Sequence, residues 1–165
     1  MNELLHNLIE ALREELKQYG EMLALLETQQ QLVIQRQTEE LLGNVSDVNA
    51  QVEAIQAARR EREQHQRHLA RLLALPEQAG FAEILPRLPA VYQPLVQALV
   101  QENNELLTRV QQRARQNHVL LSRAVELMQR FISTLCPGAA PATYNESGRT
   151  LTVLQTPHLL YNAVG

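Results

Sequence analysis

Apolar residues recur at helical spacing along three long stretches of the chain. In residues 2–42 they stand three or four positions apart, or at multiples that keep the same face: Leu5, Leu8, Leu12, Leu16, Tyr19, Leu23, Leu26, Val33 and Leu41. Such a stripe is typical of an amphipathic α-helix. Gly43 follows, and because glycine is common just after a helix, we expect the first helix to end near residue 42.

The second stretch, residues 46–75, is apolar at both ends and charged in its middle. Ser46 or Asp47 is suited to cap its start, and Pro76 stops it. Between two apolar ends, the segment RREREQHQRH puts charge where the stripe should continue. We therefore expect a helix with a polar waist, whose inner face carries Val48, Val52, Ile55, Leu69, Leu72 and Leu73.

The third stretch, residues 92–135, predicts the longest helix, which Pro137-Gly138 ends. A proline-rich connector, residues 76–94, precedes it and has room for one helical turn around residues 81–85. Residues 136–165 have turn chemistry, and we expect them to form a flexible, irregular tail. The main stripe of the third helix is Leu95, Leu99, Leu106, Val110, Leu121, Ala124, Met128, Phe131 and Leu135.

These elements predict an all-α fold. A helix of about 40 residues is some 60 Å long, whereas a compact globule of this size is only about 40 Å across. We therefore expect residues 1–135 to form an elongated up-and-down antiparallel bundle of three long helices, with a short fourth in the connector.

The composition agrees with a helical protein and indicates its cellular compartment. The 165 residues suit one domain, and the scarcity of aromatic residues (4 %) and glycine (6) argues against β and α/β folds. Cys136 is the single cysteine, which excludes an internal disulfide and a cysteine-based zinc site. The N-terminus is periodic and acidic, and no run approaches the roughly 18 apolar residues of a membrane span. We expect a cytoplasmic protein without membrane insertion.

No motif in the chain supports catalysis or a cofactor. His65 and His68 are three positions apart and could share a metal ion, but no ligand pattern surrounds them, so a solvated helix face is expected. There is no phosphate-binding glycine loop and no nucleophile motif. We expect a protein that is not an enzyme and has no metal and no cofactor.

Charge is unevenly distributed but does not indicate nucleic-acid binding. Residues 1–47 have a net charge of −6, whereas residues 53–71 and 101–130 each have +2. Nucleic-acid binding favours a stronger basic face with stacking aromatics. Because acids are interleaved with these arginines, we expect no nucleic-acid partner. We expect instead that the negative charge of the first helix complements the positive charge of the other two.

The end of the third helix carries more apolar surface than one bundle face can bury. Its sequence from Val119 is VLLSRAVELMQRFISTL. A helix in a three-helix bundle buries one face, so the remainder needs a second partner. Three occupants are possible: the chain's own tail, an amphipathic helix of another protein, or a second copy in a structural coiled-coil protein that homo-oligomerises through this segment.

In its layout the chain resembles the FlgN family of flagellar type III export chaperones. The resemblance is most specific in the third helix, at residues 102–107 (ENNELL) and 115–117 (RQN), and after the proline break, at residues 143–150 (TYNESGRT). The latter segment is similar to the family's Tyr-x-x-x-Gly segment. A second Tyr-Asn-x-x-Gly at residues 161–165 matches less well and receives no role.

The resemblance implies a chaperone that binds the C-terminal amphipathic helix of hook-associated, hook–filament junction proteins and delivers them to the export gate. It implies that Tyr144 docks to the export-gate protein FlhA. The protein itself is expected to be a monomer or weak oligomer. The client-binding surface that the resemblance implies is the late third helix, through Leu120, Leu121, Ala124, Leu127, Met128, Phe131 and Leu135.

Overall fold

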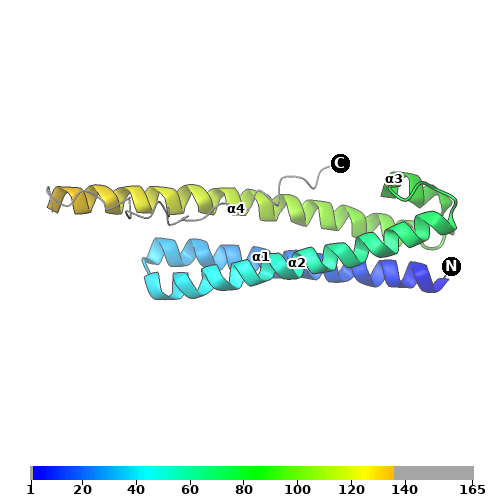
Figure 1. The fold of residues 1–165 in the computed structure, drawn as a ribbon, viewed down its shortest axis with the longest axis horizontal. Coiled ribbons are helices and arrows are strands. Elements are labelled where there is room, and N and C mark those ends of the chain that lie inside the picture. Colours follow the sequence, from blue (N-terminus) through cyan, green and yellow to red (C-terminus); the bar gives the residue numbers. More distant parts are fainter. Residues whose placement is uncertain (1, 136–165) are drawn as a thin grey trace, which may run out of the picture. The chain divides into compact units, whose positions relative to one another are not determined.

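The structure, a computed structural model, describes residues 2–135, all of whose regular elements are helical. The chain divides into two units, Met1–Asn117 and His118–Gly165, and the last helix runs from the first unit into the second. The all-α class is confirmed for the described residues, while the expected tail, residues 136–165, lies outside them. The elements are α1 (Asn2–Gln35), α2 (Thr38–Leu72), α3 (Phe81–Ile84), the 3-10 turn η1 (Leu85–Arg87) and α4 (Gln93–Leu135) (Figure 1).

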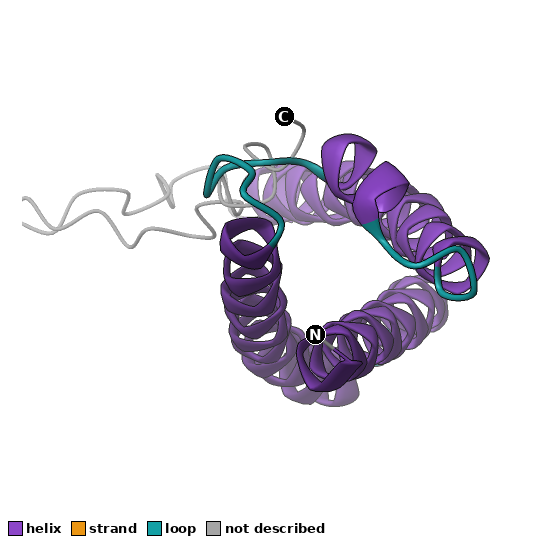
Figure 2. Ribbon diagram, turned by 90° about the vertical axis from the view of Figure 1, so that its right-hand side faces the viewer, coloured by secondary structure: helices purple, strands orange, loops and turns teal. Residues whose placement is uncertain are grey.

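In the first unit, α1 and α2 form an antiparallel hairpin. The Asn44 side chain donates a hydrogen bond to the Leu25 carbonyl (3.0 Å), and the Gln51 side chain donates one to the Gln18 carbonyl (2.9 Å). Gln51 comes seven residues after Asn44, whereas Gln18 comes seven residues before Leu25. As one number rises, the other falls by the same amount, which is the signature of antiparallel helices in register. Figure 2 looks along these helices and shows the three long helices at the corners of a triangle.

The first part of α4 runs parallel to α1, and two buried asparagines hold the two helices together. Asn103 donates to the Leu12 carbonyl (3.0 Å), and Asn117 donates to the Leu26 carbonyl (2.6 Å). Both pairs are 91 positions apart, so the register is the same over four turns of helix. These side chains are only 6 % and 2 % exposed. The up-and-down order that the sequence predicts is therefore present in this unit.

The turn between the first two helices lies earlier than expected. It falls at Arg36 and Gln37, whereas Gly43, Ser46 and Asp47 are all inside α2. Arg36 takes a positive φ of 58°, and the Gln37 N–H donates to the Leu32 carbonyl (3.0 Å). A left-handed arginine costs about 1–2 kcal/mol. We attribute the early turn to packing, because it brings the buried Asn44 back against α1.

The remaining helix ends also differ in detail from the prediction. α2 ends at Leu72 rather than near residue 75, because Ala74 takes a positive φ of 55° and the Leu75 N–H returns to the Ala70 carbonyl (2.9 Å). Such a left-handed cap closes many helices. α4 begins at Gln93, as the prolines predict. On its stripe Leu95 is 39 % exposed, and the neighbouring Val96 takes the fully buried place.

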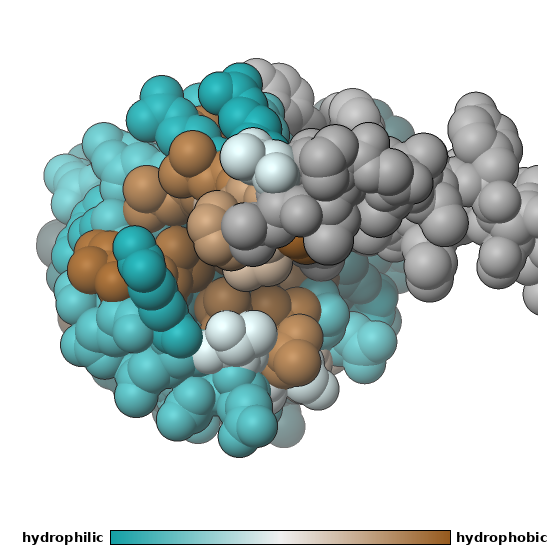
Figure 3. Space-filling view, turned by 90° about the vertical axis from the view of Figure 1, so that its left-hand side faces the viewer, coloured by the Kyte–Doolittle hydropathy of each residue, from teal (hydrophilic) through white to brown (hydrophobic). Residues whose placement is uncertain are grey.

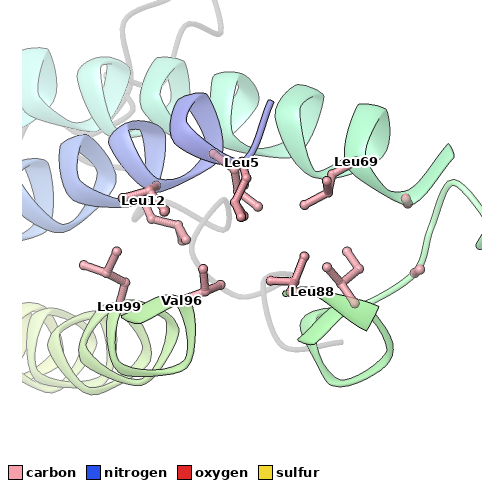
Figure 4. Close-up of a cluster of buried hydrophobic side chains, with 11 residues drawn as sticks. Leu5, Leu12, Leu69, Leu88, Val96 and Leu99 are labelled. Carbon is pink, nitrogen blue, oxygen red and sulfur yellow. The ribbon is translucent and has the colours of Figure 1, made fainter. Parts of the chain in front are cut away.

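The connector closes one end of the first unit, and it contains the expected helical turn as α3. Ile84 of α3 and Leu88 after η1 are buried, at 0 % and 4 % exposure. They pack with leucines of α1 and α2 and with the start of α4 (Figure 4). The prolines therefore shape a cap over the core. The cluster is Leu5, Leu8, Ile9, Leu12, Leu69, Ala70, Ala79, Ile84, Leu88, Val96 and Leu99.

The polar waist expected in the second helix is a buried ion pair between α1 and α2. The Arg62 Nε donates to Glu15 Oε2 (2.9 Å), and the Tyr19 hydroxyl donates to Glu15 Oε1 (2.9 Å). Glu15 is 4 % exposed. Burial, followed by the charge of Glu15, raises the pKa of Tyr19 above its usual range, so the phenol stays protonated and keeps donating. Arg62 also lies over the Phe81 ring, 6.0 Å from its centroid.

We predict that Arg62→Met lowers the free energy of unfolding by about 2–4 kcal/mol, because it leaves the Glu15 carboxylate buried without its cation. The measurement is urea unfolding followed by circular dichroism. Arg67→Met is the control: its guanidinium donates only to the Glu63 carbonyl at the surface, so we expect a change within about 0.5 kcal/mol. Equal losses in the two variants would contradict a structural role for the buried pair.

Candidate protein-binding surface

One line of α4 residues at seven-residue spacing changes from buried to exposed along the helix. Val96, Asn103, Val110 and Asn117 are at most 6 % exposed. The next two positions on the line are Ala124, which is exposed, and Phe131, which is 64 % exposed. The face that α4 buries in the first unit is thus continued in the second unit by apolar residues that are open to solvent.

Eight apolar residues of the second unit lie on one side of α4, whereas Val119 lies on the polar side. At 100° per residue they cover an arc of about 160° of the helix. Met128 and Leu127 are 64 % and 65 % exposed. Figure 3, viewed from the side on which α4 ends in Figure 1, shows hydrophobic side chains at the surface. We call this side the α4 apolar face: Leu120, Leu121, Ala124, Val125, Leu127, Met128, Phe131 and Ile132.

Most of the client-surface residues named from the sequence lie on this face and are accessible. Ala124, Leu127, Met128 and Phe131 are exposed, whereas Leu120 and Leu121 are half-buried; the Leu135 side chain and Tyr144 lie outside the described residues. The sequence-based list omitted Val125 and Ile132, which are 49 % and 51 % exposed. Their seven-residue spacing on the edge of the arc could have identified them.

The two borders of the α4 apolar face differ in charge. Arg123 and Arg130 lie beside Leu127, four residues before it and three after it. The opposite border, beside Val125, carries the uncharged Ser122 and Gln129. The one acid in residues 118–135 is Glu126, on the polar side. The face is therefore apolar in the middle and basic along one border.

The two histidines singled out from the sequence lie on α2, and one of them lines a polar cleft. His65 lines a polar cleft between α1 and α2 with Glu10, Glu14 and Glu61, and its Nε2 lies 3.9 Å from Glu61 Oε1. His68 is exposed. Over residues 2–135, no three histidine, cysteine or acidic side chains are grouped to hold a metal ion, and no helix is long and apolar enough to cross a bilayer.

The chemistry of the α4 apolar face is that of a surface that buries another apolar surface. Covering about 300 Å² of it at ~25 cal/mol per Å² would contribute on the order of 7 kcal/mol before the costs of association. Methionine adapts to differently shaped partners, and an arc of about 160° matches the apolar stripe of an amphipathic helix. The face is suited to bind a helix.

Comparison with known proteins gives one family. The family model described as FlgN protein matches residues 1–152, which includes every described residue and Tyr144 and ends before Tyr161. Neither the curated proteins nor the solved structures contain a match to this chain.

A matched pair of valines in α4 tests where the core ends. We predict that Val110→Ala, at 1 % exposure, lowers the free energy of unfolding by about 2 kcal/mol through lost burial and a cavity. Val125→Ala, at 49 % exposure, should change it by less than about 0.5 kcal/mol. Urea titration of both variants measures this, and a loss at Val125 equal to that at Val110 would show that the face is part of the core.

Proposed function

The chain belongs to the FlgN family and has the general role of a flagellar export chaperone, and on that premise we propose that the α4 apolar face is its client-binding surface. The clients are the hook-associated junction proteins, which are bound through their C-terminal amphipathic helices. The observation that carries this proposal is the change along α4. The same face is buried up to Asn117 and exposed at Ala124 and Phe131.

A client helix on this surface would continue the packing that the first unit uses. In that unit, α4 packs its Val96 and Val110 positions into clusters contributed by α1 and α2. In residues 118–135 the equivalent positions are free for a helix that comes from another protein. Covering the apolar stripe of the client keeps it from associating before export, and the reaction needs no nucleotide and no catalytic group.

Delivery to the export gate is the second part of the proposal. We assign docking on FlhA to Tyr144, which lies within the range matched by the family and outside the described residues. Tyr144 is nine residues beyond the end of α4 at Leu135. Client binding and gate docking therefore involve different segments, and both can take place in the cytoplasm while the client is held.

We predict that Phe131→Glu lowers the affinity for the C-terminal helix of a junction protein at least tenfold, because it places a charge in the middle of the apolar face. Calorimetric titration measures the affinity, and circular dichroism checks that the fold is intact. Thr108→Glu, on an exposed position of α4 in the first unit, is the control and should bind normally. Unchanged binding by Phe131→Glu would remove the face from the proposal.

Tyr144→Ala should have the opposite pattern. We expect it to leave client affinity unchanged and to weaken binding to the cytoplasmic part of FlhA, because the aromatic anchor is lost. Pull-down with purified FlhA, in the presence and absence of client helix, measures this. Tyr161→Ala is the matched control, since it alters the second Tyr-Asn-x-x-Gly. Equal loss of both activities in Tyr144→Ala would contradict the division of labour.

A structural role remains the second candidate, because the same exposed face suits self-association. It predicts a stable dimer that client helices do not dissociate, whereas the chaperone proposal predicts a monomer or weak oligomer that yields a 1:1 complex. Light scattering before and after addition of the client helix distinguishes the two.

A further inference from the structure

The two arginines on the basic border of the α4 apolar face form no ion pair within the described residues. Five others have carboxylate partners within the described residues: Arg13, Arg59, Arg62, Arg71 and Arg113. Arg123 and Arg130 are exposed, and their guanidinium groups have no hydrogen-bond or ion-pair partner among residues 2–135. Glu126 is three residues from Arg123 and four from Arg130, yet it pairs with neither.

The spacing of these two arginines matches the geometry of paired helices. They are seven residues apart, about 10 Å along the axis, so both lie on the same border of the apolar face. In packed helices, charged residues at such flanking positions form ion pairs with the partner helix, and these pairs determine which helix binds and in which orientation. A partner helix with carboxylates at the same seven-residue spacing could therefore pair with both guanidinium groups.

Building on the proposed function, we propose that the α4 apolar face selects partner helices with acidic residues seven positions apart along one border of their apolar stripe. The opposite border of the face carries the uncharged Ser122 and Gln129, so it does not select for charged residues on the partner helix. Two exposed ion pairs add little to affinity, so their effect is to choose among amphipathic helices and to orient the one that binds.

Other occupants fit this border less well. The same segment of a second copy would offer either the same arginines or the uncharged border around Ser122 and Gln129, because residues 118–135 contain a single acid, Glu126, on the polar side. The chain's own residues 136–165 contain one acidic residue, Glu146. Neither supplies two carboxylates seven positions apart, so charge complementarity favours a helix from another protein.

The test uses two synthetic 21-residue amphipathic helices with the same leucine stripe, one bordered by glutamates and the other by lysines. Calorimetry with the full chain at low salt measures both affinities. We expect the glutamate helix to bind about tenfold more tightly than the lysine helix, and added salt should reduce this ratio. In the double variant Arg123→Glu/Arg130→Glu the ratio should invert.

The matched control is Arg109→Glu, which makes the same charge change at an exposed position fourteen residues before Arg123 on α4. It should keep the wild-type ratio. If both helices bind equally and Phe131→Glu abolishes both, the face binds helices without selection by its border; the inference then fails and the proposed function stands. If neither helix binds, or if Phe131→Glu has no effect on binding, the proposed function fails together with the inference.

Discussion

A carboxylate buried between helices must meet a cation, and in this protein that demand determines how α1 and α2 align. Glu15 stands midway between Leu8 and Met22, at the heptad position where its neighbours are apolar, and Arg62 stands midway between Ile55 and Leu69 in the same way. A slip of one heptad would place the carboxylate against isoleucine or leucine and leave both charges without a partner. The pair thus permits one register for the hairpin.

The asparagines of α4 extend the same principle to the third helix. Asn103 and Asn117 alternate with Val96 and Val110 along one line of α4, and their side-chain amides donate hydrogen bonds to main-chain carbonyls of α1. A buried amide selects one register at some cost in stability. This attachment uses α4 up to Asn117. α4 has 43 residues, against 34 and 35 in α1 and α2, and its last eighteen residues keep an apolar face whose free energy of burial is available to another protein.

The periodicity of the sequence predicts much of this, because long amphipathic stripes determine helix type and face. It identified three long helices, the polar waist, the turn in the connector and most of the exposed face. It placed the first turn at Gly43, since glycine is the usual signal, whereas the chain turns at Arg36 in a conformation that arginine rarely adopts. It also missed Asn103 and Asn117, because a polar residue on an apolar stripe looks like surface until its partner is seen.

The central claim is that α4 is one helix with two uses, a first part that is packed internally and a last part that is left for a client. Hydrogen–deuterium exchange along α4, with and without the C-terminal helix of a junction protein, tests it most directly. We predict that residues 93–117 are protected in the free protein and change little, whereas residues 118–135 exchange rapidly and become protected when the client binds. Protection of residues 118–135 in the free protein that the client leaves unchanged would contradict the claim.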